Sequence, residues 1–478
     1  MVMTATTRFF AFVFLLLGTP LFTLNCARAD PVFACGDTGA ATPAPICADH
    51  ELVGLGKAVD ARLKSVLAQA DSLTALLLRR DQAWFEDILL GEDTPRFAGQ
   101  DNPERQRLKH VLEQRLATLG AIKPRAIAAT PAGSWANALA AVTATEAGGE
   151  ALAVTFTARL VYQGREALTC DLAGSFKADQ TGWFAGALAA ADGTQAKARL
   201  RLQGSTLRLV YAGESDPPPS VCGPLRIITG SYFPMAPAHK GAPVAVAAGT
   251  VSPSFKCEAA ENSDEVETCA DPELASRDTQ IARVYTQTLR RLPPRVAAQL
   301  RADERGWAKD NPTAYDAALH WPGNKENYML HDTEGGREEL MRRLDERWAM
   351  LVNLDEKRKG LMGLWEAYNA VVTVVPAKDK DGGPLIADGF KWVVGDRKEF
   401  CVFKSAGRLE GATFKPAEEF PTLTRDGPTL VTSIEAPDHD AMPAGGPPGY
   451  CNNMRSAKAR LFPVKPAAGE GAKFDRQR

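Results

Sequence analysis

The feature that most constrains the fold is a long internal repeat. Cys35 and Cys47 are twelve positions apart, and so are Cys257 and Cys269. The second cysteine of each pair begins a similar phrase, CADHEL in the first copy and CADPEL in the second, at an offset of 222 residues. A repeat this long fixes the domain plan before any single motif is interpreted. We therefore expect two tandem copies of one unit of roughly 220 residues.

The repeat continues along the chain with small changes in offset. The matching pairs are LRRDQAW from Leu78 with LRADERGW from Leu300, LEQR from Leu112 with LDER from Leu344, GSW from Gly133 with GLW from Gly363, Cys170 with Cys401, and Cys222 with Cys451. Spacing alone does not establish disulfide connectivity. Pairing within each copy is nevertheless the only scheme that both copies can follow identically, and it predicts Cys35–Cys47, Cys170–Cys222, Cys257–Cys269 and Cys401–Cys451.

The first part of each copy has the pattern of amphipathic helices. Apolar residues recur at spacings of three and four over residues 50–69, and the pattern resumes after a break at Asp71-Ser72. The second copy repeats this with a break at Pro293-Pro294. We expect a helical hairpin in each copy. A further helical run follows in each copy, at residues 108–119 and 340–351.

The second part of each copy alternates apolar with small or polar residues, which is typical of strands with one buried face. Residues 152–162 alternate in this way, and residues 198–211 form two such runs around Gln203-Gly204-Ser205, which predicts a β-hairpin. In the second copy, residues 370–375 and 390–394 are the comparable strands. The expected fold is therefore α+β: two tandem units, each a disulfide-tethered helical hairpin domain followed by a small antiparallel β domain.

The first thirty residues have the features of an export signal. Arg8 precedes an apolar run from Phe9 to Leu24, and the small residues Ala27 and Ala29 predict cleavage after Ala29. A lipid anchor at Cys26 is disfavoured because Asn25 stands where a small residue is needed. A periplasmic or secreted location is expected. The expected boundaries are a signal peptide at 1–29, helical domains at 30–120 and 255–352, β domains at 121–234 and 353–464, an Ala/Pro-rich linker at 235–254, and a disordered tail at 465–478.

Charge and cysteine usage restrict the possible partners. The chain has 56 Lys and Arg against 58 Asp and Glu, so its net charge is −2 and no basic excess favours nucleic acid. Loss of the signal peptide would leave eight cysteines, an even number suited to an oxidising compartment. No CxxC pair occurs, which disfavours a zinc ribbon or a thioredoxin-like redox site.

The segment from Cys257 to Leu274 is the most acidic part of the chain. Asp271, Pro272 and Glu273 fit a helix start, with Asp271 as the N-cap. The acids lack the spacing of a calcium loop, so no metal or cofactor is expected. They could form a solvated acidic face or a patch that binds a basic partner; the residues of the patch are Glu258, Glu261, Asp264, Glu265, Glu267, Asp271 and Glu273.

The two cysteines, the phrase CADPEL, the amphipathic helix and the second helix ending in Trp307 resemble the LprI-like lysozyme inhibitor family. The resemblance covers residues 33 to about 120 and 255 to about 352, and it is weaker in the first copy, which has His50 in place of Pro272. It implies an exported bacterial helical module and, by analogy, lysozyme inhibition. Residues 229–232 (TGSY) also resemble a loop of the β-barrel C-type lysozyme inhibitors, although the rest of that pattern is absent.

Motifs for other chemistry are weak. The sequence has no GxSxG, HExxH or phosphate-binding Gly-Lys loop. Asp438-His439-Asp440 fits a solvated loop better than an acid–base or metal site, and Asp81 and Glu304 fit exposed helix faces better than a pair of glycosidase acids. Arg115 and Arg347 are expected to pair with helix carboxylates.

Three functions remain open after this comparison of motifs. The first is a non-enzymatic inhibitor that binds a basic lysozyme-type muramidase, with the acidic patch steering association. The second is a structural or adaptor protein of the periplasm, in which two units give bivalent contact. The third is an envelope hydrolase whose site has no recognised motif.

Overall fold

The computed structural model describes residues 44–86, 103–124, 130–160, 168–212, 228–235, 250–260, 262–310, 328–376, 385–393, 399–417, 422–434 and 457–466. The predicted signal peptide, most of the predicted linker and residues 467–478 lie outside these ranges. Within them, no helix combines the length and apolar character needed to cross a membrane. Unit 1 denotes residues 30–234 below, and unit 2 denotes residues 255–464.

Unit 1 begins with helices and continues with strands. Its helices are α1 (Ala44–Cys47), α2 (His50–Leu67), α3 (Ser72–Trp84) and α4 (Pro103–Ala121). Its strands are β1 (Gly133–Ala136), β2 (Ala140–Glu146), β3 (Ala151–Leu160), β4 (Leu168–Ala178), β5 (Phe184–Ala189), β6 (Gln195–Gln203), β7 (Thr206–Tyr211) and β9 (Gly230–Pro234). The strand expected at 152–162 and the hairpin expected around Gly204 are both present.

Unit 2 repeats this order. It has the 3₁₀ helix η2 (Cys257–Ala259) and the helices α5 (Ser263–Ala270), α6 (Pro272–Arg291), α7 (Pro294–Asp310) and α9 (Tyr328–Val352). Its strands are β10 (Gly363–Ala367), β11 (Ala370–Pro376), β12 (Leu385–Val393), β13 (Glu399–Glu410), β14 (Thr413–Pro416), β15 (Thr422–Asp426), β16 (Thr429–Ile434) and β17 (Ala457–Val464).

The strands of each unit form a closed barrel. In unit 1, eight antiparallel strands follow one another in chain order, and β1 closes the sheet by pairing with β9 through Trp135 and Pro234. In unit 2, β10 pairs with β17 through Trp365 and Pro463. The expected small β domain is therefore wrong. Alternation shows which face of a strand is buried, but closure depends on pairing between the first and last strands, which alternation does not reveal.

The helices do not form separate hairpin domains. The main helical contacts are α2 with α4 and α6 with α9, whereas the expected hairpin partners α2 and α3, or α6 and α7, touch only near their ends. In unit 1, Leu52, Val59 and Leu112 share one buried core with barrel residues such as Phe156 and Tyr232. The expected fold of a helical hairpin domain followed by a β domain is thus corrected to helices joined to a closed barrel in each unit. In unit 1 the apolar helix faces are buried against the barrel, whereas the helices of unit 2 form a core of their own that includes Phe462 and Val464 of β17.

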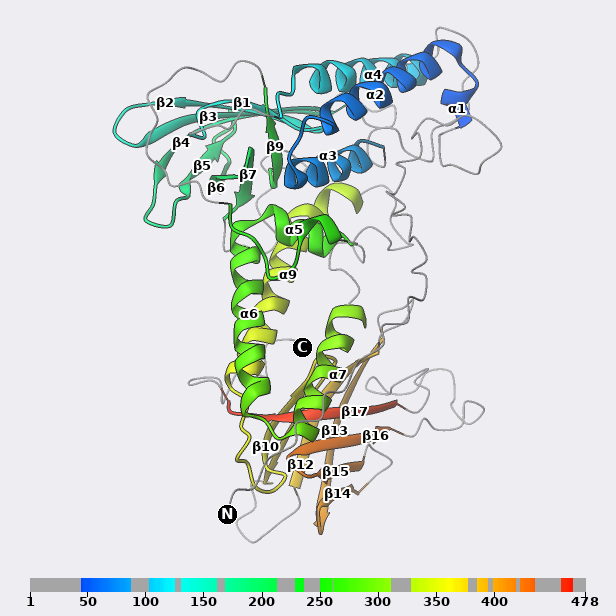
Figure 1. The fold of residues 1–478 in the computed structure, drawn as a ribbon, viewed down its shortest axis with the longest axis vertical. Helices are drawn as coiled ribbons and strands as arrows, with labels where there is room; N and C mark the ends of the chain where they lie inside the picture. Colours follow the sequence, from blue (N-terminus) through cyan, green and yellow to red (C-terminus); the bar gives the residue numbers. More distant parts are fainter. Residues whose placement is uncertain are drawn as a thin grey trace, which may run out of the picture.

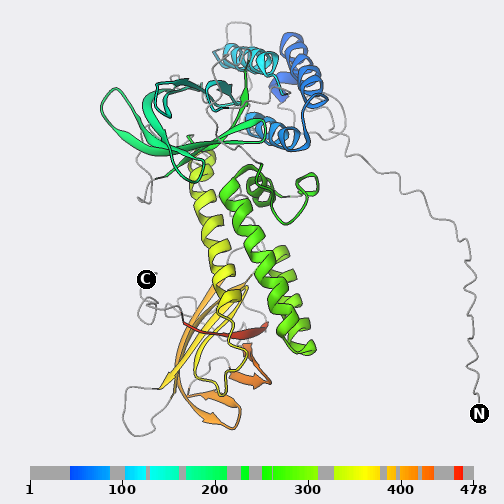
Figure 2. The same cartoon turned by 60° about the vertical axis from the view of Figure 1, so that its left-hand side comes forward.

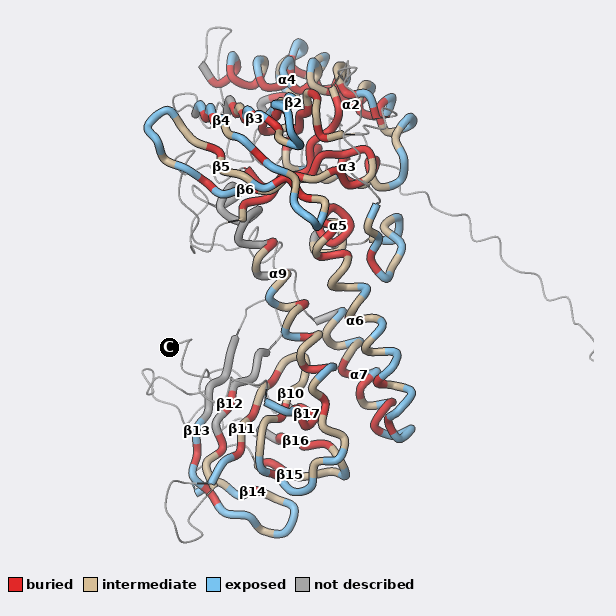
Figure 3. The backbone as a smooth tube through the Cα atoms, turned by 90° about the vertical axis from the view of Figure 1, so that its left-hand side faces the viewer, coloured by how far each residue is buried: buried red, intermediate tan, exposed pale blue. Residues whose placement is uncertain are grey.

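The two barrels lie at opposite ends of the molecule, and α6 and α9 run side by side between them (Figures 1 and 2). Helix α5 lies against the barrel of unit 1 together with the first turns of α6 (Figure 1). Burial is concentrated in the barrels and around α5, while the middle of α6 and α9 is more exposed (Figure 3). The helices of unit 2 therefore contact both barrels.

Helix starts follow local capping rules. Asp49, Asp71 and Asp271 cap α2, α3 and α6, and each accepts a backbone N–H bond from the first turn of its helix. The carboxylate of Asp271 accepts bonds from the N–H groups of Glu273 and Leu274, and Pro272 occupies the first helical position. The predicted cap at Asp271 is therefore confirmed.

Candidate functional site

A buried Asp–Arg pair joins the helices of unit 1 to its barrel. Asp81 on α3 is 4% exposed and its Oδ2 lies 2.7 Å from Arg115 Nη1 on α4. Its other oxygen accepts a 2.8 Å bond from the backbone N–H of Ala138, between β1 and β2. The expected pairing of Arg115 with a helix carboxylate is confirmed. The expected exposure of Asp81 is wrong, because the barrel covers the carboxylate and supplies a donor to it.

The same pair recurs in unit 2. Asp303 on α7 lies 2.7 Å from Arg347 on α9, and it accepts a 3.0 Å bond from the backbone N–H of Tyr368 between β10 and β11. Glu304 also binds Arg347. The pairing expected for Arg347 is confirmed. Both copies therefore use one Asp to fix a helix to the barrel, which is a structural use of these acids rather than a glycosidase pair.

A second repeated cluster surrounds the N-caps of α2 and α6. Arg105 on α4 donates to Asp49 at 2.6 Å and to Glu51 at 2.6 Å. The hydrogen bond from Arg105 lowers the pKa of Asp49. In unit 2, Arg337 on α9 donates to Asp271 at 2.7 Å and to Glu273 at 2.6 Å. This clamp holds the start of one helix against another within each unit.

Unit 2 adds a further acid to its clamp, and the arginines that bind it come from unit 1. Glu267 on α5 has no exposed surface and is paired with Arg80 of α3 and Arg208 of β7. Arg208 also reaches Asp271, with 3.3 Å between Nε and Oδ2. We call this cluster, comprising Arg80, Arg208, Glu267, Asp271 and Arg337, the charged joint. It connects α3 and β7 of unit 1 to α5, α6 and α9 of unit 2.

Polar contacts extend the joint on both sides. Arg199 on β6 forms a bidentate pair with Glu273, at 2.7 and 2.8 Å. The side chain of Gln203, at the end of β6, donates to the backbone carbonyls of Val251 at 2.8 Å and Cys269 at 3.1 Å. The barrel of unit 1 (barrel 1) therefore binds both the segment that leads into unit 2 and the start of α6.

The electrostatics of the joint favour charged side chains. Burial would raise the pKa of Glu267, but the positive charges of Arg208 and Arg80 outweigh it and hold the pKa below its usual value. Burial opposes ionisation of Asp271 as well, but the charges of Arg337 and Arg208 outweigh it and hold the pKa of Asp271 below its usual value. Both carboxylates are therefore ionised at neutral pH, and each needs its arginines in place.

The seven acids predicted to bind a partner lie in different environments. Glu267 and Asp271 are buried in the joint, and Glu273 is half-buried between Arg199 and Arg337. A partner could reach Glu267 or Asp271 only after the joint had opened. Of the others, Asp264 and Glu265 are half-buried on α5, Glu258 is exposed on η2, and Glu261 lies outside the described residues.

The predicted disulfide between Cys257 and Cys269 is confirmed, with Cα atoms 5.9 Å apart. It ties η2 to the end of α5, beside the bond from Gln203 to Cys269. Cys47 and Cys170 are each disulfide-bonded as well. Their predicted partners Cys35 and Cys222 lie outside the described residues, as do Cys451 and the side chain of Cys401.

Sequence reasoning missed the arginines of the joint. Arg80 stands in LRRDQAW where the second copy has Ala302, and Arg208 stands in the strand TLRLVY where the second copy has Val431. Both arginines and Glu267 are therefore residues that the repeat does not share. These arginines could have been paired with Glu267 by looking for opposite charges among the residues that differ between the two copies.

Other candidate sites gain no support. Among the described residues, no three His, Cys, Asp or Glu side chains are placed to hold a metal ion. Asp438-His439-Asp440 lies outside those residues. Tyr232, from the TGSY segment, is fully buried in β9 and donates to the carbonyl of Ile228 at 3.0 Å. Comparison of the chain with known protein families, curated proteins and solved structures finds no match.

Proposed function

We propose that this protein is a non-enzymatic, two-headed binding protein of the bacterial envelope, in which two barrel units are presented at a fixed separation. The observation that carries the proposal is the charged joint. Glu267 has no exposed surface, and its partners Arg80 and Arg208 belong to the other unit. Such a joint holds the units in one relative orientation, because separating them would break both ion pairs of Glu267 and the bonds that Arg199 and Gln203 make to unit 2.

Two independent binding units need no such joint. Two binding units can act together through a flexible linker, which places the second unit at a raised effective concentration. Burial of ionised groups is unfavourable unless geometry and hydrogen bonding offset it. An adaptor that spans a set distance between two contacts benefits from a fixed orientation, and this favours the adaptor function over two independent binding units.

Small-angle scattering of the full chain tests the fixed separation. At concentrations low enough for the chain to be monomeric, we expect wild-type protein to fit one separation between the barrels, and Arg208→Ala to fit a broad range of separations while its circular dichroism spectrum is retained. Arg201→Ala is the matched control, because Arg201 is also on barrel 1 but donates to Thr181 of its own barrel at 3.1 Å. A broad range of separations in the wild-type protein would contradict the proposal.

Lysozyme inhibition is the second candidate, and a basic muramidase is its proposed partner. It is supported by the resemblance of residues 255–352 to the LprI-like family and by the resemblance of residues 229–232 to a loop of the β-barrel C-type lysozyme inhibitors, which in this chain belongs to a closed barrel. Glu258 is exposed and Glu265 is half-buried, and both lie outside the charged joint, where their charges can steer a basic protein. Export to the periplasm belongs to this proposal too, and the signal-like residues 1–29 support it.

A turbidity assay of cell-wall lysis tests this second candidate. We expect excess protein to slow lysis by a C-type lysozyme and this inhibition to weaken as salt rises, whereas charge reversal at Glu258 and Glu265 should weaken the inhibition and reduce its dependence on salt. Glu146→Lys on β2 is the control, since Glu146 is exposed and lies on barrel 1. Unchanged lysis at excess wild-type protein would remove lysozyme as a partner while the scattering test of the joint still stands.

A further inference from the structure

Unit 1 carries a docking face that unit 2 of the same chain occupies. The face consists of α3 and the β6–β7 turn, and it contacts η2, α5, Thr250 and Val251. All six residues of β7 are buried, so both faces of that strand are covered. Arg208, which points out of the barrel, keeps 1% of its side-chain surface.

Unit 2 has the same face without an occupant among the described residues. The β15–β16 turn repeats the β6–β7 turn: Thr206 donates to the carbonyl of Gln203 at 2.9 Å, and Thr429 donates to that of Asp426 at 2.9 Å. The turn glycines Gly204 and Gly427 have φ of 60° and 63°. These matches place Val431 where unit 1 has Arg208, and Val431 is half-exposed.

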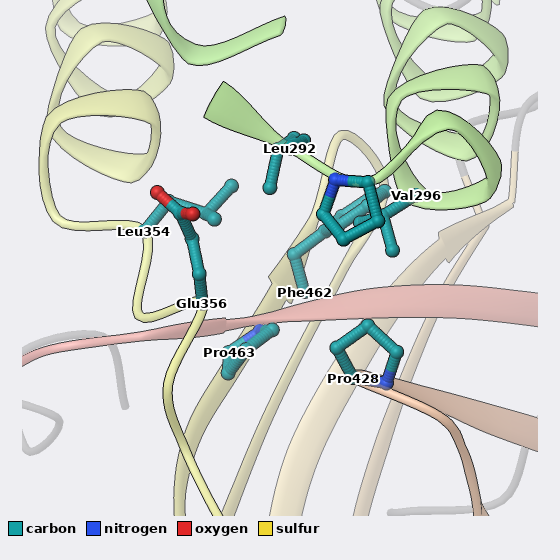
Figure 4. A pocket seen from close by; sticks show the side chains of 8 residues that line it. Leu292, Val296, Leu354, Glu356, Pro428, Phe462 and Pro463 are labelled. Atoms are coloured by element: carbon teal, nitrogen blue, oxygen red, sulfur yellow. The ribbon is translucent and has the colours of Figure 1, made fainter. Parts of the chain in front are cut away.

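Three hydrogen-bonding residues of this face in unit 1 are replaced by apolar residues in unit 2. In unit 1, Asp71, Thr74 and Ser205 form a hydrogen-bonded trio between α3 and the turn, with Thr74 and Ser205 hydroxyls 2.6 Å apart. Unit 2 has apolar residues at these positions, Pro293, Val296 and Pro428. They line a small cavity of about 30 Å³ beside Leu292 and Phe462 (Figure 4).

The two arginines of the unit 1 face are also replaced by apolar residues in unit 2. Arg80 and Arg208 of unit 1 correspond to Ala302 and Val431 of unit 2. Unit 2 therefore has no arginine at either position where unit 1 binds Glu267. An acidic segment like α5 would leave its carboxylate unpaired on this face.

The segment that would fit the open face is the start of unit 1. Residues 252–257, which lead into the docked elements η2 and α5, read SPSFKC, and residues 30–35 read DPVFAC, with Pro, Phe and Cys in register. The position of Glu267 is taken by Pro45, and those of Asp264 and Glu265 by Thr42 and Pro43. The three positions that form the Glu267 ion pairs are thus uncharged in the proposed contact, and Arg295 and Asp426 on the face of unit 2 pair with each other.

We propose that the open face of unit 2, formed by α7 and the β15–β16 turn around Val431, binds the start of unit 1 of a second copy of this chain. The occupant cannot come from the same chain, because α1 packs in the core of its own unit through Ile46 and the charged joint fixes the two units. The contact is head to tail, so it joins chains into a ring or an open filament rather than a twofold dimer.

Sedimentation velocity of the full chain over a concentration series tests the proposal. The average mass of the wild-type protein is expected to rise with concentration beyond about twofold that of one chain. Val431→Glu would place an unpaired charge in the contact and keep the protein monomeric. Leu409→Glu is the matched control, since Leu409 is 52% exposed on β13 of the same barrel and should associate like wild type.

A charge-swap experiment tests the register of the contact. Pro45→Glu and Val431→Arg recreate, on separate chains, the pair made by Glu267 and Arg208. Each variant alone is expected to stay monomeric, whereas an equimolar mixture associates. Circular dichroism and thermal melting verify that each variant is folded. A wild-type chain that stays monomeric at every concentration would overturn the proposal, as would association that survives Val431→Glu or a mixture that stays monomeric.

Discussion

Glu267 is the residue on which the contact between the units depends. Its carboxylate is bound by Arg80, 187 positions earlier, and by Arg208, 59 positions earlier. The sequence predicted the cap at Asp271, because a cap needs only its own first turn. It did not predict the burial of Glu267, because an acidic side chain in a loop-rich segment is usually solvated and its partners come from other elements.

Replacing Glu267 with Gln is expected to destabilise the contact between the units. The substitution removes the carboxylate that pairs with Arg80 and leaves Arg208 with Asp271, and loss of one partner of a buried pair typically costs about 3–5 kcal/mol. In denaturant unfolding followed by circular dichroism, we expect the units to unfold in separate transitions, the first at lower denaturant concentration than in wild type. Glu146→Gln, at an exposed site on β2, should unfold like wild type. Equal midpoints for the two variants would contradict this role of Glu267.

At the scale of elements, sequence periodicity predicted most helices and several strands but not their partners. The run at residues 50–69 became α2, and the alternation at 152–162 became β3. The neighbours of an element depend on side chains far away in sequence, such as the pairing of Trp135 with Pro234 that closes barrel 1. For the same reason α6 packs along α9 instead of α7.

The Cys257–Cys269 disulfide is expected to stabilise α5 in its docked position. Its loss in Cys257→Ser/Cys269→Ser should lower the stability of this region by about 2–4 kcal/mol, the usual effect of a short-loop disulfide. Because Gln203 binds the Cys269 carbonyl, the bond between the units weakens as well. Hydrogen exchange is the measurement: amides of α5 should exchange faster in the variant, while those of β3 and β4 stay protected. Uniform protection in both proteins would show that the disulfide does not hold α5.

On the scale of the whole molecule, the two copies agree in their internal contacts and differ where they meet. Asp81 with Arg115 and Asp303 with Arg347 are the same contact made twice. Arg208 and Glu267, by contrast, have no counterpart in the other copy. The repeat itself was visible in the sequence. The unequal charges of the two copies could be interpreted only from the structure, which shows that residues of unit 1 contact the start of unit 2.

Acid is therefore expected to separate the units before it unfolds the barrels. The pKa values of Glu267 and Asp271 are lowered in the folded protein, since the positive charges of their arginines outweigh the burial that would raise them. Groups with a lowered folded pKa contribute stability that is complete above their ordinary values, about 4, and is lost as pH falls toward the folded value. The joint should thus be intact from neutral pH down to about 5 and weaken below about 4.

Sedimentation and scattering between pH 7 and pH 3 measure this effect, with circular dichroism reporting on the barrels. We expect a lower sedimentation coefficient and a broader range of barrel separations to develop below about pH 4. Glu267→Gln is the internal control: it should show the separated state at neutral pH and a weaker dependence on acid, because one of the two titrating carboxylates is gone. Separation between pH 5 and 8, where histidine titrates, would show instead that other groups control the joint.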